Sequence, residues 1–160
     1  MTPRKAQNVL EKLGKGFPIV AVTGPRQSGK TTLVRHTFPT KHYVSLEDPD
    51  ERAFAEEDPR GFLARFPDGA IFDEVQRQPS LFSYLQGLVD KHQTMGEFVL
   101  TGSQQFGLLT QITQTLAGRV GLIQLLPFSI EEIAVSATPP RLMTEQLWLG
   151  FYPPLYDREV

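Results

Sequence analysis

The sequence contains no cysteine and only three histidines, and these absences exclude several kinds of site. Without cysteine there can be no disulfide bond and no thiolate metal centre. The histidines, at positions 36, 42 and 92, do not have the spacing of metal ligands. Any bound metal ion must therefore be held by oxygen atoms.

Long apolar runs and an excess of one charge are also missing. No run approaches the roughly 20 apolar residues that span a bilayer, and residues 1–16 lack a hydrophobic core of the signal-peptide type. The sequence therefore predicts a cytoplasmic protein with no membrane partner. The 16 basic and 18 acidic residues nearly balance, without a Lys/Arg block. A nucleic-acid partner is thus neither required nor excluded.

The 160 residues are 40% hydrophobic, which is enough for the core of one domain. Five short apolar runs cover residues 17–24, 41–48, 69–75, 97–103 and 120–126. Several of them are continuously apolar rather than alternating, which is typical of parallel strands buried on both faces. Helical patterns lie between the runs, so the sequence predicts a three-layer α/β domain with a parallel sheet.

Helix positions follow from apolar spacing and from capping residues. A first helix is expected over residues 3–13, and Asp50 and Asp58 are candidate caps of two short helices. Two further helices are predicted by the spacing of Leu81, Tyr84, Leu85 and Leu88 and of Phe106, Leu109, Ile112 and Leu116. The proline-containing stretch 136–140 suggests a break, which divides the chain into one domain over 1–135 and a linker with the start of another element over 136–160.

A glycine-rich stretch, TGPRQSGKTT at residues 23–32, follows the first apolar run. Gly24, Gly29, Lys30 and Thr31 satisfy the pattern G-x-x-x-x-G-K-[ST] of a phosphate-binding loop (Walker A). Such a loop curls its backbone N–H groups around an anion, while the lysine reaches the β and γ phosphates and the threonine hydroxyl ligates magnesium. The predicted nucleotide contacts are Gly24, Pro25, Arg26, Gln27, Ser28, Gly29, Lys30, Thr31 and Thr32. The alternative is an ordinary turn with a surface lysine.

An acidic pair, Asp73 and Glu74, ends the third apolar run. In an α/β sheet the ligand crevice lies at the carboxyl ends of the strands. We therefore predict that Asp73 holds the magnesium ion through water and that Glu74 orients or deprotonates a hydrolytic water. The alternative is two solvated acids in a turn. Glu47 and Asp48 end the second run, either close to this crevice or as the start of a helix.

With these motifs the chain resembles the prokaryotic AAA-type ATPases whose ATP-binding domain is followed by a C-terminal domain of unassigned function. The segments that carry the resemblance are GPRQSGKTTL, YVSLEDPDERAFAEEDPRGFL, GAIFDEVQRQPSLFSYLQGLVD, FVLTGSQQF, LAGRVGLIQLLPFSIEEI and LWLGFYPPLYD. The resemblance implies a P-loop NTPase fold with a five-stranded sheet of order 5-1-4-3-2, and ATP with Mg²⁺ as cofactors. It also implies a C-terminal domain starting near GFYPP.

Two more site residues are implied by this resemblance. Ser103, with its neighbour Gln104, stands where similar ATPases keep a polar sensor of the γ-phosphate, although it could simply cap the next helix. Arg119 stands where they carry an arginine finger, which acts in trans in a homo-oligomer. The alternative for Arg119 is a structural role at a helix C-terminus.

The leading functional interpretation is Mg²⁺-dependent ATP binding and hydrolysis coupled to movement of an attached domain or partner. The main alternative is an ATP/ADP-dependent switch without turnover. A small-molecule kinase is less favoured because Glu74 suits water as the acceptor. A GTPase is weaker still, since Asp58–Gly61 imitates a D-x-x-G switch but no N-K-x-D motif is present.

Overall fold

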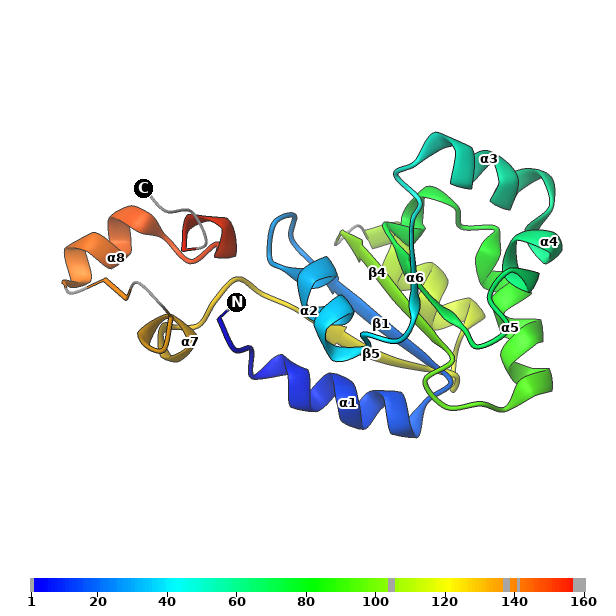
Figure 1. Ribbon diagram of the computed structural model, residues 1–160, viewed down its shortest axis with the longest axis horizontal. Helices are drawn as coiled ribbons and strands as arrows, with labels where there is room; N and C mark the ends of the chain where they lie inside the picture. The colour runs from blue at the N-terminus through cyan, green and yellow to red at the C-terminus, as the bar shows by residue number, and fades with distance from the viewer. Residues whose placement is uncertain (1, 104–105, 137–138, 141, 157–160) are drawn as a thin grey trace.

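The computed structural model of the protein is an α/β domain built on one parallel sheet (Figure 1). It describes residues 2–103, 106–136, 139–140 and 142–156, and of residues 106–108 only the backbone. The strands are β1 (Ile19–Gly24), β2 (His42–Ser45), β3 (Ala70–Asp73), β4 (Phe98–Ser103) and β5 (Val120–Gln124). Each lies inside one of the five apolar runs. In the described part of the chain, no helix has the length and apolar character needed to cross a membrane.

The strand order is β2-β3-β4-β1-β5, which is the predicted order 5-1-4-3-2 read from the other edge. The parallel register pairs Gly24 with Ser103 and Ser45 with Asp73. Because parallel strands end at the same edge of the sheet, these four residues gather there. The predicted fold class is therefore confirmed, and the chain reversals after β1, β3 and β4 share one edge.

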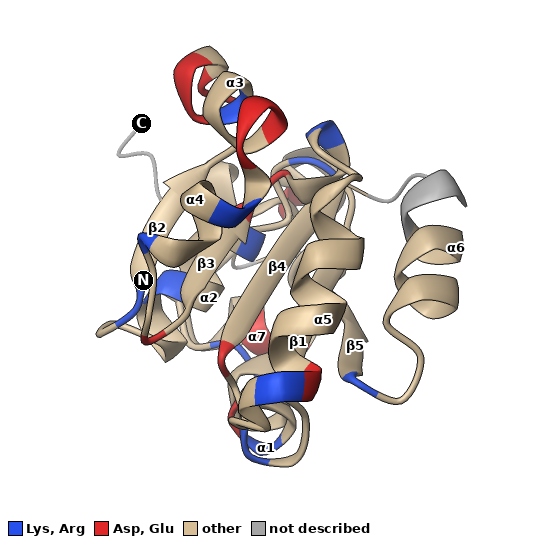
Figure 2. Cartoon of the chain, turned by 90° about the vertical axis from the view of Figure 1, so that its right-hand side faces the viewer, with Lys and Arg blue, Asp and Glu red and all other residues tan. Residues whose placement is uncertain are grey.

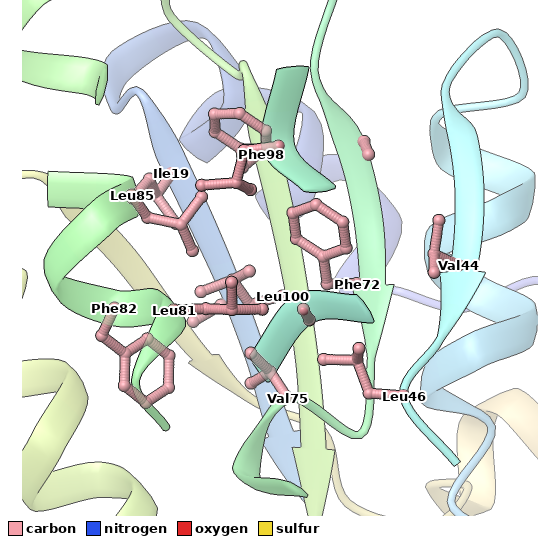
Figure 3. Packing of buried hydrophobic residues seen from close by; sticks show 14 of the residues in the cluster. Ile19, Val44, Leu46, Phe72, Val75, Leu81, Phe82, Leu85, Phe98 and Leu100 are labelled. Atoms are coloured by element: carbon pink, nitrogen blue, oxygen red, sulfur yellow. The ribbon is translucent and has the colours of Figure 1, made fainter. Parts of the chain in front are cut away.

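Both faces of the sheet are apolar. Along β1, Ile19 and Ala21 belong to one core cluster, whereas Val20 and Val22 belong to the other, as the alternation of a strand requires. The larger cluster contains the stacked rings of Phe72 and Phe98, with centroids 5.8 Å apart (Figure 3). This explains why the strand sequences are continuously apolar.

Helices cover both faces and so complete the three layers. They are α1 (Ala6–Gly16), α2 (Lys30–Thr37), α3 (Pro49–Glu57), α4 (Pro59–Ala64), α5 (Leu81–His92), α6 (Phe106–Thr115), α7 (Ile130–Ala134) and α8 (Met143–Leu149), with 3₁₀ turns η1 (Val75–Arg77) and η2 (Pro153–Leu155). Leu10 of α1 and Leu33 of α2 pack on one face, whereas Leu85 of α5 and Ile112 of α6 pack on the other. Acidic residues gather on α3 at one end of the molecule (Figure 2).

The predicted first helix and one predicted cap need correction. Helix α1 spans Ala6–Gly16 and not residues 3–13, and Gly14, the expected end, lies within it against the ring of Phe38. The cap of α3 is Asp48, whose side chain accepts from the N–H of Asp50, so Asp50 is inside the helix. Asp58 does cap α4, which explains the D-x-x-G imitation as a helix start.

Helices α7 and α8 and turn η2 lie beyond the carboxyl edge of the sheet (Figure 1). The N–H of Phe128 donates to the carbonyl of Phe151 (2.8 Å), and the ring of Tyr156 packs edge-on against Phe128. Helix α8 exposes apolar side chains, with Met143 80% and Trp148 91% exposed. The C-terminal segment is therefore anchored at Phe128, while α8 presents an apolar surface to its surroundings.

A buried arginine, Arg4, connects four parts of the chain. Its guanidinium donates to Glu132 Oε1 (3.2 Å) in α7, to the carbonyl of Ser28 (3.0 Å) and to the carbonyl of Leu126 (2.7 Å). It also lies over the ring of Phe128, 4.7 Å from the centroid. The residues before α1 are thereby tied to the glycine-rich loop, to the segment after β5 and to α7.

Candidate functional site

The glycine-rich loop, residues 24–29, joins β1 to α2 at the carboxyl edge of the sheet. A Cβ on Gly24 would lie 2.1 Å from the carbonyl oxygen of Leu125, so no larger residue fits there. Gly29 opens α2 in the left-handed region, with φ +88°. These conformations suit a loop that turns backbone N–H groups toward an anion, and the N-terminus of α2 adds a partial positive charge.

Lys30 is buried beside this loop. Its Nζ donates to the carbonyl oxygens of Gly24 (3.2 Å) and Pro25 (2.8 Å). Burial lowers the pKa of Lys30, and the nearby carboxylates of Glu74 and Asp73 oppose this shift. The ammonium group thus lies in the mouth of the loop, where phosphate oxygens can replace the two carbonyls.

The Asp73 carboxylate accepts hydrogen bonds from three hydroxyl groups. Its Oδ2 accepts from Thr31 Oγ1 (2.9 Å) and from the Tyr43 hydroxyl (2.7 Å), and its Oδ1 accepts from Thr101 Oγ1. The structure therefore brings the two predicted metal ligands, Thr31 and Asp73, into contact.

This pair of oxygen ligands fits Mg²⁺. The ion prefers hard oxygens and in proteins usually keeps several waters or phosphate oxygens in its shell. Among the described residues no group of three or more histidine, cysteine, aspartate or glutamate side chains could hold a metal ion. A hydroxyl and a single carboxylate next to a phosphate loop are sufficient for magnesium held partly by a nucleotide.

The Tyr43 hydroxyl has a raised pKa. Burial, followed by the hydrogen bond to Asp73, raises the pKa of Tyr43 from 10.0 to about 12. Between pH 10 and about pH 12, Tyr43 of the unfolded chain has lost its phenolic proton, whereas Tyr43 of the folded chain has kept it. The contribution of Tyr43 to stability is therefore complete below pH 10 and is lost as the pH rises to about 12.

We expect the difference between the tyrosinate absorbance titrations of the wild type and Tyr43→Phe to show one transition near pH 12. A transition near pH 10 in this difference would contradict the contact with Asp73.

Glu74 lies next to Asp73 in the left-handed conformation, with φ +57°. Its Oε2 accepts from the side-chain amide of Gln76, and the same amide nitrogen donates to Ser103 Oγ (2.9 Å). The predicted base and the predicted sensor are thus joined by a glutamine that the sequence analysis did not single out. Gln104 lies outside the described residues.

Lys30, Thr31 and Glu74 border a cleft of about 590 Å³. It is lined by Arg26, Gln27, Gly29, Lys30, Thr31, Thr32, Glu47, Glu74, Arg77, Pro153 and Pro154. Arg77 pairs with Glu47 across the rim at 3.3 Å. The two acids that follow β2 therefore have different positions, because Glu47 borders the cleft whereas Asp48 caps α3. The cleft combines a cationic loop with carboxylates, as a polyphosphate with a divalent cation requires.

Arg119 lies far from the cleft, although the sequence predicted it as a site residue. The predicted residues Gly24, Pro25, Ser28, Asp73 and Ser103 do not line the cleft either. Arg119 precedes β5, and its carbonyl accepts from the N–H of Ile19 at the start of β1. Ile19 and Gly24 are about 16 Å apart at about 3.3 Å per strand residue, so Arg119 lies at the opposite edge from the loop. Its guanidinium forms a double hydrogen bond with Asp90 (2.6 and 2.8 Å). This geometry fits a structural role, and action in trans stays a prediction.

Several site residues had no signal in the local sequence. Tyr43 donates a hydrogen bond to Asp73, and Gln76 donates one to Glu74. The positions of these side chains depend on strand pairing. Pro153 and Pro154 reach the cleft from the C-terminal segment. The proline pair was visible in FYPPLYD, yet only the tertiary structure puts it beside the loop.

Two known proteins from mycobacteria are similar in sequence. The uncharacterized proteins Rv2008c of Mycobacterium tuberculosis and Mb2031c of Mycobacterium bovis are each 34% identical over 143 residues, 87% of this chain. The chain spans 31% of the length of each relative.

Solved structures share the fold at low identity. The Walker-type ATPase PABY2304 of Pyrococcus abyssi matches 96% of this chain and 65% of its own, with TM-score 0.64 and 17% identity. AMPPCP-bound DnaA of Aquifex aeolicus matches 94% of this chain and 56% of its own, with TM-score 0.59 and 15% identity. Both likenesses show the P-loop fold. A family model described as an AAA domain matches residues 16–134. The chain therefore belongs to the AAA domain family.

Proposed function

We propose that this domain binds ATP with Mg²⁺ and hydrolyses the bond between the β and γ phosphates. The observation that carries the proposal is that Lys30, Thr31 and Glu74 line one cleft at the carboxyl edge of the sheet, with Asp73 hydrogen-bonded to Thr31. Membership of the AAA domain family supports the same function.

In this proposal the glycine-rich loop and Lys30 bind the β and γ phosphates. Lys30 exchanges its two carbonyl partners for phosphate oxygens. Thr31 would hold the magnesium ion directly and Asp73 through water, and the bound ion would offset the negative charge of the phosphates. Tyr43 and Thr101 fix the orientation of the Asp73 carboxylate.

Glu74 is the proposed general base. It takes a proton from a water whose oxygen attacks the γ phosphorus in line, the bond to the β-phosphate oxygen breaks, and ADP leaves. Ser103, connected to Glu74 through Gln76, would sense the γ-phosphate or the attacking water. Arg119 can contribute only from a neighbouring copy, since it lies at the opposite edge of its own sheet.

The output of hydrolysis in this proposal is conformational. The relatives continue well beyond the matched region, since the match covers 31% of their length. Helix α8 exposes Met143, Leu147 and Trp148, which are suited to contact an attached domain or a protein partner.

A nucleotide-dependent switch without turnover is the second candidate. It is favoured by one observation, namely that Glu74 Oε2 is already engaged by Gln76. Tight binding of ATP without release of phosphate at any protein concentration would favour the switch.

Lys30→Ala tests nucleotide binding itself. Loss of the ammonium group removes charge-assisted hydrogen bonds to phosphate, so we expect affinity for Mg·ATP in titration calorimetry to fall roughly ten- to a hundredfold. Lys41→Ala is the matched control, because Lys41 is also partly buried and donates to backbone carbonyls, those of Asp68 and Glu97, away from the cleft. Equal affinity in wild type and Lys30→Ala, or no heat from ATP in the wild type, would contradict the proposal.

A further inference from the structure

Helices α4 and α5 lie side by side (Figure 1) and border a second cleft of about 600 Å³, which we call the α4/α5 groove. None of its lining residues also lines the cleft at the glycine-rich loop. Helix α5 turns Leu81 and Leu85 into the core (Figure 3), whereas its residues Tyr84, Leu88 and Lys91 line the groove. From Tyr84 to Lys91 the groove follows α5 for about 10 Å, at about 1.5 Å per residue.

The α4/α5 groove combines an apolar surface with unpaired positive charge. Leu63 of α4 and Phe66, which follows that helix, are buried along it. The basic side chains that line it are Arg60, Lys91 and His92, and none of the described acidic residues lines it. His92 Nδ1 is hydrogen-bonded to Glu97 Oε1 at 2.7 Å. Arg60 and Lys91 have no carboxylate partner among the described residues. The groove is therefore complementary to an apolar ligand that carries negative charge.

Gly87 lies in the middle of α5, is exposed and lines the groove. Glycine weakens a helix interior, because it loses more conformational freedom on folding than other residues do. The fold itself does not require glycine here, since φ is not positive and a Cβ at this position would meet no atom within 4 Å. The missing side chain leaves open space in the centre of the groove, where a second backbone can approach α5 closely.

We propose that the α4/α5 groove binds an amphipathic helix of a partner protein, one that carries acidic residues beside its apolar row. In this arrangement the apolar row packs over Gly87 and contacts Leu63 and Leu88, while the acidic residues pair with Arg60 and Lys91. A groove that follows one helix for about two turns offers a docked helix contacts at each turn. The groove is separate from the nucleotide cleft, so this inference does not depend on the proposed nucleotide binding.

The test uses two fluorescein-labelled peptides of about 15 residues that share one row of leucines at helical spacing. One peptide carries glutamate beside the row and the other carries lysine, and fluorescence anisotropy measures their affinities for the whole chain. We expect the glutamate peptide to bind at least about tenfold more tightly than the lysine peptide. Equal affinities, or no binding of the glutamate peptide to the wild type, would overturn the inference.

Gly87→Leu fills the centre of the groove with a side chain. We expect this variant to fold, which thermal unfolding checks, because its Cβ lies in open space and leucine is a good helix former. Its affinity for the glutamate peptide should be at least about tenfold lower than that of the wild type. Gly16→Leu, at the end of α1, is the matched control, since a Cβ there also meets no atom within 4 Å. Wild-type affinity in Gly87→Leu would contradict the proposed site.

Lys91→Glu tests the charge of the groove without filling it. We expect the ratio of the two peptide affinities to fall at least about fivefold, because a cation facing the acidic residues is replaced by an anion. Lys12→Glu, on the exposed face of α1, makes the same change of net charge and should leave the ratio near its wild-type value. An unchanged ratio in Lys91→Glu would overturn the inference, and this result stands even where Gly87→Leu fails to fold.

Two other occupants would give different results. A second copy of this chain in the groove would appear as a dimer of the wild type in sedimentation, and Gly87→Leu would abolish that dimer. A small amphipathic anion would appear as binding of decanoate that Gly87→Leu abolishes, without binding of the glutamate peptide. Either result would overturn a partner helix as the occupant of the groove.

Discussion

Replacing Glu74 with glutamine is expected to lower the rate of ATP hydrolysis by roughly 10²–10⁴-fold, which is the usual contribution of a general base. Glutamine keeps the size of the side chain and can still bond to Gln76, but it cannot take a proton from water. Affinity for Mg·ATP should stay within a few-fold of the wild type. Phosphate release under single-turnover conditions measures the first quantity, and titration calorimetry measures the second.

Glu47→Gln is the matched control for this change. Glu47 also borders the cleft, but its carboxylate pairs with Arg77 at the exposed rim. We expect this variant to retain most of the hydrolysis rate. Equal rates for the wild type and Glu74→Gln would reject Glu74 as the base, and equal losses in both glutamine variants would indicate a general effect of charge in the cleft.

Replacing Arg4 with methionine is expected to destabilise the fold by about 3 kcal/mol, because it leaves the buried carboxylate of Glu132 without its cation. The same change removes the donors to the carbonyls of Ser28 and Leu126. Burial lowers the pKa of Arg4, and the ion pair with Glu132 opposes that shift. Urea unfolding of the chain measures the loss of free energy.

Lys5→Ala provides the comparison for Arg4. The side chain of Lys5 forms an ion pair with Glu131 in which both groups are about two-thirds exposed, 68% and 70%. Such surface pairs contribute about 0–1 kcal/mol. The backbone N–H of Lys5, which donates to Glu132, is unaffected by the substitution. If Arg4→Met cost no more than Lys5→Ala, the buried pair would not be the connection between the loop and α7.

The positions of the glycine-rich loop and of the acidic pair at one edge of the sheet were predictable because their signals are local. Gly24, Gly29, Lys30 and Thr31 belong to one short stretch, and the loop conformation depends on these residues and their immediate flanks. Asp73 and Glu74 follow a buried strand, and parallel strands place such ends at a common edge. Strand and helix positions followed from apolar periodicity, although α1 extended past Gly14 and Asp48 replaced Asp50 as a cap.

The order of the strands came from the family resemblance and was confirmed by the structure. Arg119 was assigned in the same way. It directly precedes β5 and therefore lies at the amino end of that strand. The structure puts it at the edge of the sheet away from the loop and pairs it with Asp90. Contact with a neighbouring copy is a property of an assembly, which neither one sequence nor one chain determines.

By itself, the sequence determined the fold class and the placement of a glycine-rich loop at the same edge as an acidic strand end, because periodicity and loop conformation depend on residues close together in the chain. The tertiary structure alone decided that Tyr43 bonds to Asp73, that Gln76 joins Glu74 to Ser103, and that Pro153 packs beside Gly29. These contacts follow from strand register and from the path of the C-terminal segment. Both are set by the packing of residues far apart in sequence, which no local pattern encodes.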